Sequence, residues 1–553
     1  MPYLYEKYAA AFMNTDGTID NIKFNIPGDF NFGFDIVDVM GKKNPEKPAM
    51  VWVAKDGSDK VFTFGDMMKY SAKAANYFLS LGIKKGDRVM LVLKKHYQFW
   101  FAIVGLHKIG AVAIPATHLL MTHDYVYRFN TAKVTGIVCT SDGDTVKSID
   151  EAHPECPLLK VKCVVNTNDV GDGWNDFDAG LEAASDEYKR PQGDMDTTVE
   201  EPMIMYFTSG TTGHPKIAVH NHAYAAAHIV TARWWHNVNP EGVHFTMADT
   251  GWGKAVWGKL YGQWACEACV FTYDYDRFDS SEVLPMFKKY NITTFCAPPT
   301  IYRFFIKEDL SKHDLSSLEY ATIAGEALNP EVYNRFYDAT GIKLMEGFGQ
   351  TETTLTVMNS IGMEPKPGSM GKPNPHYAVG LMTPEGTKAQ PGQVGEIVLY
   401  TKDGVSPGMF TGYYLDEGRT NEVWFDGAYH TGDMAWMDED GYYWYVGRTD
   451  DLIKSSGYRI GPFEIESVIM ELPYVLECAI TGVPDPIRGQ VVKATIVLVG
   501  GTEKTDALKA EIQEYVKTNT APYKYPRIVE FVDALPKTIS GKIRRVELRN
   551  ENK

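Results

Sequence analysis

Residues 203–219 are the stretch that most constrains this chain of 553 residues. An apolar run at 203–207 is typical of a short buried strand, and a second apolar run follows at 217–219. Between them, residues 208–216 read TSGTTGHPK. Gly lets backbone N–H groups converge on an anion, the hydroxyls add donors, and Lys216 adds positive charge. The stretch therefore predicts a loop that binds a polyphosphate. The alternative is an ordinary Ser/Thr/Gly turn at the surface.

Two common nucleotide-binding patterns are absent from the motifs found here. Pro215 stands before Lys216 where a Walker loop has Gly, so the loop is of another kind. A second Gly-containing motif, GFGQTE at residues 347–352, has Glu352 where the GxGxxG pattern needs its third Gly. A dinucleotide-binding fold is therefore not supported.

Length, charge and cysteine usage limit the class of protein. A chain of this length is expected to form roughly two to four domains. A net charge of −16 argues against a general nucleic-acid binder, so a pocket for an anionic nucleotide has to be locally basic. Neither a signal peptide nor an apolar stretch that could span a bilayer is evident. Seven scattered Cys indicate reduced thiols. We expect a cytoplasmic enzyme without nucleic-acid partners.

Most of the chain alternates between predicted strands and helices. Helices are expected at residues 64–81, 98–109 and 122–130, and strands at 88–93, 111–114 and 137–139. This alternation is typical of a parallel sheet covered by helices. Residues 1–45 are expected to lie over the surface as an arm. An Ala-rich helix is expected at 221–235, and the nearby His220 and His222 are interpreted as structural, because no acids or Cys accompany them.

The last hundred residues have a pattern of their own. Residues 447–461 are polar, hold three Gly and are predicted to be a linker and hinge. Helices are predicted after it at 465–472 and 506–519, and strands at 475–483, 493–499 and 527–531, which suffices for a small α+β domain. The predicted fold is therefore a large N-terminal domain of helix-covered α/β sheets in several subdomains (1–449) and a small mobile α+β domain (450–553).

Five motifs in order resemble the adenylate-forming enzymes, which include acyl-CoA synthetases, luciferases and peptide-synthetase adenylation domains. These motifs lie at residues 208–216, 347–352, 429–433 (YHTGD), 447–466 and 536–545 (PKTISGKIRR). The Pro- and Gly-rich residues 361–379 are most similar to the medium-chain acyl-CoA synthetases. The resemblance spans essentially the whole chain and implies an AMP-forming acid–thiol ligase. Such an enzyme uses ATP, Mg²⁺ and CoA and forms acyl-CoA, AMP and pyrophosphate through an acyl-adenylate.

The resemblance also implies the roles of individual residues. Phe348 would lie against adenine, Thr351 would contact the α-phosphate, and Glu352 would be the metal ligand. Asp433 and Arg448 would bind the ribose. The nucleotide-binding residues that it implies are Thr208, Ser209, Gly210, Thr211, Thr212, Gly213, Gly325, Glu326, Ala327, Glu346, Gly347, Phe348, Gly349, Gln350, Thr351, Asp433 and Arg448. The catalytic residues that it implies are Lys542, Lys216 and Glu352.

A two-state mechanism follows from the same resemblance. The small domain would turn about a hinge at Asp450 between the two half-reactions. It would carry Lys542 into the site for adenylation, and then present a loop to CoA. The implied CoA-binding residues are Ser456, Gly457, Tyr458 and Arg459. Basic residues near Arg527 are further candidates for the CoA phosphates.

The acyl pocket is expected at Trp252, Gly253 and Gly349. Acetate-specific relatives carry Trp at the position of Gly349, so the resemblance implies room for a medium-chain or branched acid. Phe348 and Ala327 stand where the family commonly has Tyr or Trp and Pro, but neither change removes a charge.

The protein is expected to be a monomer or a homodimer. Several alternative functions stay open. Within the synthetases, these are an acetyl-/propionyl- or aryl-CoA synthetase. Outside them are an adenylating enzyme with another acceptor, a luciferase-like oxygenase and a non-catalytic nucleotide- or acyl-binding protein.

Overall fold

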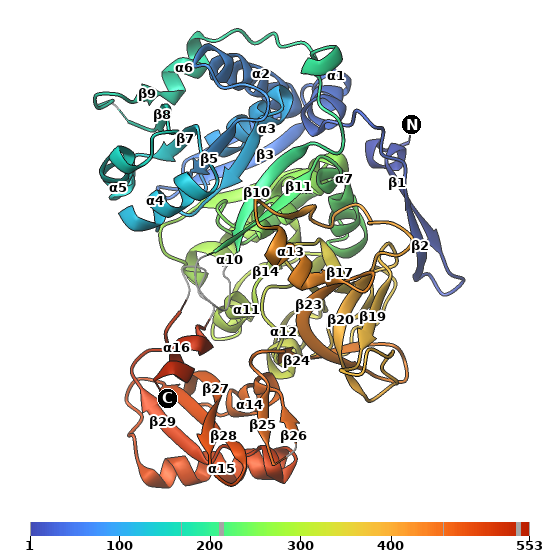
Figure 1. The fold of residues 1–553 in the computed structure, drawn as a ribbon. Helices are drawn as coiled ribbons and strands as arrows, with labels where there is room; N and C mark the ends of the chain where they lie inside the picture. The colour runs from blue at the N-terminus through green and yellow to red at the C-terminus, as the bar shows by residue number, and fades with distance from the viewer. Residues whose placement is uncertain (1, 168, 209–214, 457, 538–542, 552–553) are drawn as a thin grey trace.

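A computed structural model describes residues 2–167, 169–208, 215–456, 458–537 and 543–551 (Figure 1). The described residues form a large N-terminal part, with three large sheets, a two-stranded hairpin and helices, and a small C-terminal domain, red in Figure 1, at one end. The predicted fold class is confirmed. Among the described residues, no helix has the length and apolar character needed to cross a membrane.

The first sheet contains eight strands in the order β21-β11-β10-β6-β5-β7-β8-β9. Its strands are β5 (Arg88–Val92), β6 (Val112–Pro115), β7 (Gly136–Thr140), β8 (Val161–Val165), β9 (Asn175–Asp176), β10 (Pro202–Thr208), β11 (Lys216–Asn221) and β21 (Gly412–Tyr413). Strands β5 to β10 pair in parallel, whereas β11 and β21 are antiparallel additions at one edge. The predicted parallel sheet is therefore confirmed, with an antiparallel edge that the sequence pattern did not indicate.

The helices beside this sheet are α2 (Phe64–Ser80), α3 (Gln98–Ile109), α4 (Thr122–Thr131), α5 (Thr145–Ala152) and α6 (Phe177–Ala183). Helix α2 begins at a capping box, in which Thr63 and Asp66 bond each other's backbone N–H. All twelve residues of α3 are buried, and the helix ends at Gly110 in the left-handed conformation (φ 70°). The predicted bounds of α2, α3 and α4 agree with the structure within one residue.

The second sheet contains nine strands in the order β18-β17-β16-β15-β14-β12-β13-β3-β4. They are β3 (Pro48–Ala54), β4 (Asp59–Thr63), β12 (Val243–Thr246), β13 (Cys269–Asp274), β14 (Ile292–Ala297), β15 (Tyr320–Ile323), β16 (Leu344–Gly349), β17 (Leu355–Met358) and β18 (Lys372–Pro373). Its helices are α8 (Gly253–Lys259), α9 (Tyr261–Ala265), α10 (Ser280–Lys289), α11 (Pro299–Phe305) and α12 (Pro330–Thr340). Strand β3, from the start of the chain, joins this sheet beside β13.

The expectation of a surface arm at residues 1–45 is wrong for its second half. The hairpin of β1 (Ala9–Met13) and β2 (Ile19–Phe24) does extend from the body (Figure 1). However, Phe30 and Phe32 are fully buried, and they lead into η2 (Gly33–Asp38) and α1 (Val39–Lys43). These residues belong to the same core cluster as α2 and α3, because their apolar side chains fill the space next to those helices.

The predicted helix at 221–235 is divided. It consists of α7 (Ala223–Ile229) and a π-helical turn, η5 (Val230–Trp235). His220 and His222 precede it and are completely buried, and burial lowers the pKa of both to about 4. His220 Nε2 donates a hydrogen bond to the Thr351 carbonyl (2.7 Å), so this histidine fixes the backbone of the GFGQTE motif.

A third sheet and the small domain complete the chain. The sheet comprises β19 (Val379–Met382), β20 (Val394–Tyr400), β22 (Trp424–Phe425), β23 (Ala428–Met437) and β24 (Tyr443–Arg448), and α13 (Glu417–Val423) lies between β20 and β22 in the chain. The small domain holds β25 (Ile453–Ser455), β26 (Tyr458–Ile460), β27 (Val475–Asp485), β28 (Gly489–Leu498), β29 (Ile528–Val532), α14 (Pro462–Ile469), α15 (Asp506–Asn519) and α16 (Arg545–Asn550). The predicted linker at 447–461 is too long, because β24 ends at Arg448 and β25 begins at Ile453.

Candidate active site

The clearest cluster of predicted residues is built around Asp433. This residue lies within β23, directly opposite Arg448 on β24. Arg448 Nη1 is 3.3 Å from Asp433 Oδ2, and Gln350 Nε2 donates to the same oxygen at 2.5 Å. Tyr445 donates its hydroxyl to Asp433 Oδ1 (3.0 Å). The structure thus brings together three residues that the sequence motifs predicted from separate parts of the chain.

The local backbone makes this arrangement possible. Gly432 adopts φ 71°, and a Cβ atom there would lie 2.9 Å from Arg448 Nη2, so only glycine fits beside the guanidinium. The Gln350 side chain is held at both ends, since Nε2 also donates to the Thr431 carbonyl (2.8 Å) and Oε1 accepts from the Tyr429 hydroxyl (2.7 Å). Asp433 is therefore a carboxylate in a fixed orientation with a paired cation beside it.

The phosphate end of the site is framed by the ends of two strands. Thr208 ends β10 and Lys216 begins β11, and these two residues pair across the antiparallel strands. The predicted residues Ser209, Gly210, Thr211, Thr212 and Gly213 lie outside the described residues. Glu352 accepts a hydrogen bond at Oε1 from the hydroxyl of Tyr413 (2.8 Å), and none of the described residues donates to its Oε2. Glu352 Oε2 is therefore available to a divalent cation, which prefers hard oxygen ligands of this kind.

The residues matched to adenine lie on β16 and on the loop after β15. Phe348 is half-buried, with its ring 6.2 Å from that of Tyr445. Gly347 packs against Trp235, because a Cβ atom there would lie 2.8 Å from the indole. In the loop, Gly325 adopts φ +109° and Glu326 pairs with Arg303 at 3.1 Å. Lys254 Nζ donates to the Ala324 carbonyl (2.7 Å) and so ties α8 to this loop, next to Ala327.

Glu346, on β16, is a buried carboxyl group without a cation. Its Oε1 accepts from the Leu328 backbone (3.2 Å), whereas Oε2 has no partner among the described residues. Burial raises the pKa of Glu346 to about 8, so the group carries its proton at neutral pH. Because the group is buried, its implied role in nucleotide binding stays a prediction.

Protonation of Glu346 is expected to make stability depend on pH. Between the pKa of the unfolded chain, near 4.5, and the folded value of about 8, the native state binds one proton more than the unfolded state. The free energy of unfolding should therefore fall as pH rises through this window. Glu346→Gln, which is neutral at every pH, should flatten the curve. Denaturant unfolding of both proteins from pH 5 to pH 8 measures this, and equal slopes would contradict it.

The predicted acyl-pocket residues lie on two elements, Trp252 and Gly253 at the start of α8 and Gly349 at the end of β16. Trp252 caps α8 and Gly253 begins it, and no atom lies within 4 Å of a Cβ built on Gly253. By contrast, a Cβ on Gly349 would lie 2.3 Å from the Thr354 carbonyl oxygen and 2.8 Å from Trp257 Cη2. Trp257 therefore packs directly beside Gly349, and the room expected there for the acyl chain stays a prediction. Trp257 is itself held by a bond from Nε1 to the Tyr224 hydroxyl (2.9 Å).

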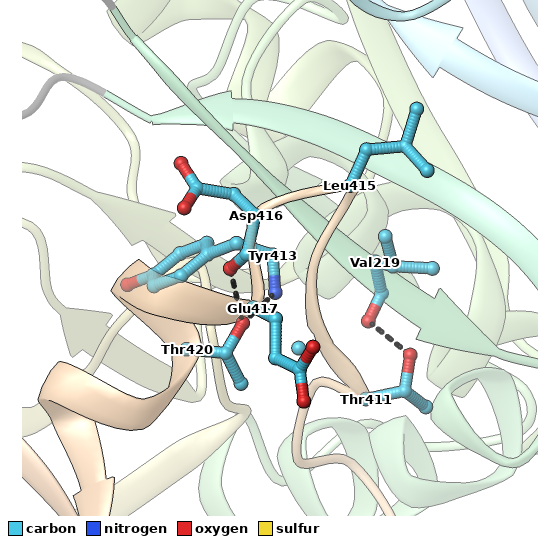
Figure 2. Close-up of a pocket in the computed structure, with 8 residues that line it drawn as sticks. Val219, Thr411, Tyr413, Leu415, Asp416, Glu417 and Thr420 are labelled. Atoms are coloured by element: carbon cyan, nitrogen blue, oxygen red, sulfur yellow. Dashed lines mark hydrogen bonds between the residues drawn. The ribbon is translucent and has the colours of Figure 1, made fainter.

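A cavity of about 460 Å³ lies next to the phosphate end, and none of its lining residues was predicted (Figure 2). It is bounded by Val219 on β11, by β21 and by the start of α13. Figure 2 shows Thr411 bonded to the Val219 carbonyl and Thr420 bonded to the Asp416 carbonyl. These bonds fix the wall of the cavity from which Tyr413 extends.

The connection to the small domain carries several ion pairs. Asp450 Oδ1 lies 3.6 Å from Arg448 Nε, and Arg549 on α16 donates to the Asp450 carbonyl (3.0 Å) and pairs with Asp451. Arg545 donates three hydrogen bonds to Glu466 on α14 (2.7, 2.8 and 3.1 Å). Helix α16 is therefore fixed beside the predicted hinge.

The predicted CoA-binding residues occupy the hairpin β25–β26. Ser456, Tyr458 and Arg459 are exposed, and the Tyr458 ring stacks on Tyr523 with 4.1 Å between centroids. Gly457 and Lys542 lie outside the described residues. On either side of residues 538–542, Lys537 and Ile543 form an antiparallel bridge.

The site residues that sequence reasoning missed are mainly aromatic: Tyr413, Tyr429, Tyr445 and Trp257. Tyr413 bonds Glu352 across 61 residues of chain, and no spacing in the sequence indicates this. Tyr445 was more accessible to prediction, because pairing residues 428–448 as a hairpin places it beside Asp433.

Comparison with known proteins identifies the family. A family model described as "AMP-binding enzyme" matches residues 37–414, and one described as "AMP-binding enzyme C-terminal domain" matches residues 464–542. The chain therefore belongs to the family of AMP-binding enzymes.

The curated relatives that match are similar to this chain in sequence over more than nine tenths of their length. Acyl-coenzyme A synthetase ACSM3, mitochondrial, from Mus musculus is 40% identical, with 100% of this chain and 96% of that protein covered. Acyl-coenzyme A synthetase ACSM5, mitochondrial, from Homo sapiens is 40% identical, with 95% and 91% covered.

Solved structures show the same fold. The anthranilate CoA ligase AuaEII in complex with anthranoyl-AMP gives a TM-score of 0.86 at 27% identity, covering 95% of this chain and 98% of that one. The Brucella canis acyl-CoA synthetase gives 0.72 at 29% identity, covering 95% and 94%.

Proposed function

We propose that this protein is an AMP-forming acyl-CoA synthetase whose substrate is a medium-chain or branched carboxylic acid. The family membership and the named relatives support the reaction class. The observation that carries the proposal is the cluster of Gln350, Asp433 and Arg448 at one end of the site, with Glu352 and Lys216 at the other. These groups supply acceptors for a ribose at one end and charges for a polyphosphate at the other.

The reaction has two steps. A carboxylate oxygen of the acid attacks the α-phosphorus of ATP, the bond from that phosphorus to the bridging oxygen breaks, and pyrophosphate leaves with the electron pair. The CoA sulfur then attacks the acyl carbon, loses its proton, and AMP leaves. Because the first step brings two anions together, it needs cations and dipoles more than an acid–base pair. Lys216 and Lys542 are the proposed protein cations.

Magnesium, when bound, neutralises phosphate charge. Glu352 is the proposed ligand, since its Oε2 is available among the described residues while Oε1 is held by Tyr413. The remaining implied roles stay proposals: Phe348 and Gly325 to Ala327 for adenine, Thr351 for the α-phosphate, and the exposed Ser456, Tyr458 and Arg459 for CoA. Their positions on the loops and strand ends described above are compatible with those roles.

The proposed domain boundary lies between residues 449 and 450, with the hinge at Asp450. The two family matches leave residues 415–463 between them, and β24 and β25 are separated only by residues 449–452. Two ion pairs lie at this point, one between Asp450 and Arg448 and one between Asp451 and Arg549. Such pairs are expected at a hinge that holds the small domain in one of two orientations.

A cytoplasmic location is also proposed, supported by seven Cys that are all free and buried. The named relatives are mitochondrial proteins. Fractionation of the source cells against markers of both compartments decides between the two locations.

The first test is to measure pyrophosphate release and CoA thioester formation on acids from acetate to decanoate, with branched and aromatic ones. We expect both products, with a maximum at roughly four to eight carbons, since each buried methylene contributes about 0.8 kcal/mol. Pyrophosphate without thioester would indicate another acceptor. Release of neither product with any acid would overturn the synthetase proposal, and a sharp preference for acetate would overturn the medium-chain assignment.

Trp257→Ala should move this maximum to longer or bulkier acids. The indole occupies the space beside Gly349, and its removal makes room for two or more methylenes, each worth about fourfold in kcat/KM. Trp257→Phe, which keeps most of the ring, is the matched control and should shift the maximum less. An unchanged order of acids in the Ala variant, with wild-type thermal stability, would show that Trp257 does not line the acyl pocket.

A further inference from the structure

We propose that Tyr413 is a positioning residue that keeps Lys216 and Glu352 apart and oriented, and thereby sets how strongly the site binds magnesium with ATP. This inference rests on the proposed function of the site. Nothing in the sequence motifs points to Tyr413, which follows Gly412 in the short strand β21.

The backbone of Tyr413 is fixed to the strand that begins with Lys216. Ala218 pairs with Tyr413 and Val219 with Gly412 across β11 and β21. The Tyr414 N–H donates to the Ile217 carbonyl (2.9 Å), and the Tyr413 N–H donates to the Thr420 hydroxyl (2.9 Å). Gly412 adopts φ +132°, a conformation that admits little besides glycine. The position of the tyrosine is thus determined by the same strand that ends the phosphate loop.

The Tyr413 side chain contacts both charged groups. Its hydroxyl donates to Glu352 Oε1 at 2.8 Å, and Lys216 Nζ lies over its ring, 4.6 Å from the centroid. The side chain is almost fully buried and its ring packs against Phe410, whose N–H donates to the Glu352 carbonyl (2.8 Å). One aromatic residue therefore holds a cation on its face and a carboxylate at its hydroxyl.

This arrangement keeps the two charges from neutralising each other. Among the described residues, Lys216 and Glu352 form no ion pair, although both contact Tyr413. Without the tyrosine, the long Lys216 side chain would pair with the Glu352 carboxylate. Lys216 would then be unavailable to the phosphates, and Glu352 would be unavailable to the metal.

The orientation of a metal ligand by such a neighbour has a known scale. Loss of a group that hydrogen-bonds a metal-binding carboxylate typically weakens metal affinity by about 10-fold to 100-fold. The effect should appear in the half-reaction that handles ATP and not in thioester formation, because only the first step involves the charged triphosphate.

The test compares Tyr413→Phe, which keeps the ring and removes the hydroxyl, with wild type. Tyr414→Phe removes a hydroxyl from the next residue and is the matched control. ATP binding is measured calorimetrically in Mg²⁺ and in EDTA without acid, and pyrophosphate release is titrated with Mg²⁺. We expect the gain in ATP affinity from Mg²⁺ to fall by about 10-fold in Tyr413→Phe, with the half-saturating Mg²⁺ rising equally and kcat recovered at high Mg²⁺.

Two further readouts separate positioning from folding. Thioester formation from supplied acyl-adenylate should be unchanged in Tyr413→Phe, and its thermal stability should match that of Tyr414→Phe. A wild-type gain in ATP affinity from Mg²⁺, or an equal loss of both half-reactions, would overturn the role of Tyr413. If wild type binds Mg²⁺-ATP and yet releases no pyrophosphate with any acid, the proposed function fails, while the calorimetric comparison still decides this inference.

Discussion

Asp433→Ala is expected to lower kcat/KM for ATP by about 10²-fold, because a hydrogen bond to a charged group is worth about 1.5–3 kcal/mol and the carboxylate is the proposed acceptor for the ribose hydroxyls. The carboxylate is almost fully buried and is bonded by Gln350, Tyr445 and Arg448. Its loss leaves the guanidinium without this partner, removes the acceptor of the Tyr445 hydroxyl and leaves Gln350 Nε2 bonded to the Thr431 carbonyl. It also removes the acceptor proposed for the ribose hydroxyls.

Initial rates of pyrophosphate release against ATP concentration measure this loss. A comparison of ATP with 2′-deoxy-ATP tests the role more directly, since wild type should prefer ATP and the variant should not. Asp433→Asn keeps the shape and one oxygen, so it should fall between the two proteins. If Asp433→Ala still preferred ATP as strongly as wild type does, another residue would have to bind the ribose.

Lys542→Ala is expected to slow acyl-adenylate formation by about 10²-fold to 10³-fold, the usual result of removing one group that stabilises developing transition-state charge. The residue lies outside the described part of the chain, but its flanks are fixed. Lys537 bridges Ile543, the Arg544 N–H donates to the Pro536 carbonyl (2.8 Å), and Arg545 is bonded to Glu466. These contacts place the segments on both sides of residues 538–542 in the small domain.

The expected result is specific to one half-reaction. Thioester formation from supplied acyl-adenylate should stay within about twofold of wild type, because no new charge is placed on phosphate in that step. Lys537→Ala is the control, since this lysine pairs with Glu477 at the surface and should affect neither step. An equal loss of both half-reactions in Lys542→Ala would contradict the adenylation role.

Local pattern was sufficient to predict much of the fold. The bounds of α3 and α15 agree with their predicted ranges residue for residue, because the apolar periodicity and the terminal residues all favour the same limits. The motif residues Gln350, Asp433 and Arg448 also meet as the resemblance implied.

Contacts between distant parts of the chain could not be predicted in this way. The burial of Phe30 and Phe32 depends on contacts with helices that follow later in the chain. Taken alone, the sequence around residues 30–43 did not show these contacts, so a surface arm was predicted. At Gly349, the missing side chain suggested space, but only the structure places Trp257 there. Tyr413 reaches the site through strand pairing with β11, for which its own sequence gives no signal.

The position of β3 in the second sheet also determines the order in which strands can pair while the chain is being synthesised. Ala49, at its start, accepts a hydrogen bond from Trp264, which is made 215 residues later. At ribosomal rates of about 5–20 residues per second, the strand therefore waits roughly 10–40 s for its parallel neighbour. During that time its other edge is already covered by the charged hairpin partner β4, while β5 to β8 can assemble without it. Strands β5 to β8 can thus assemble early on the nascent chain, whereas the second sheet closes only after more than half of the polypeptide has left the ribosome.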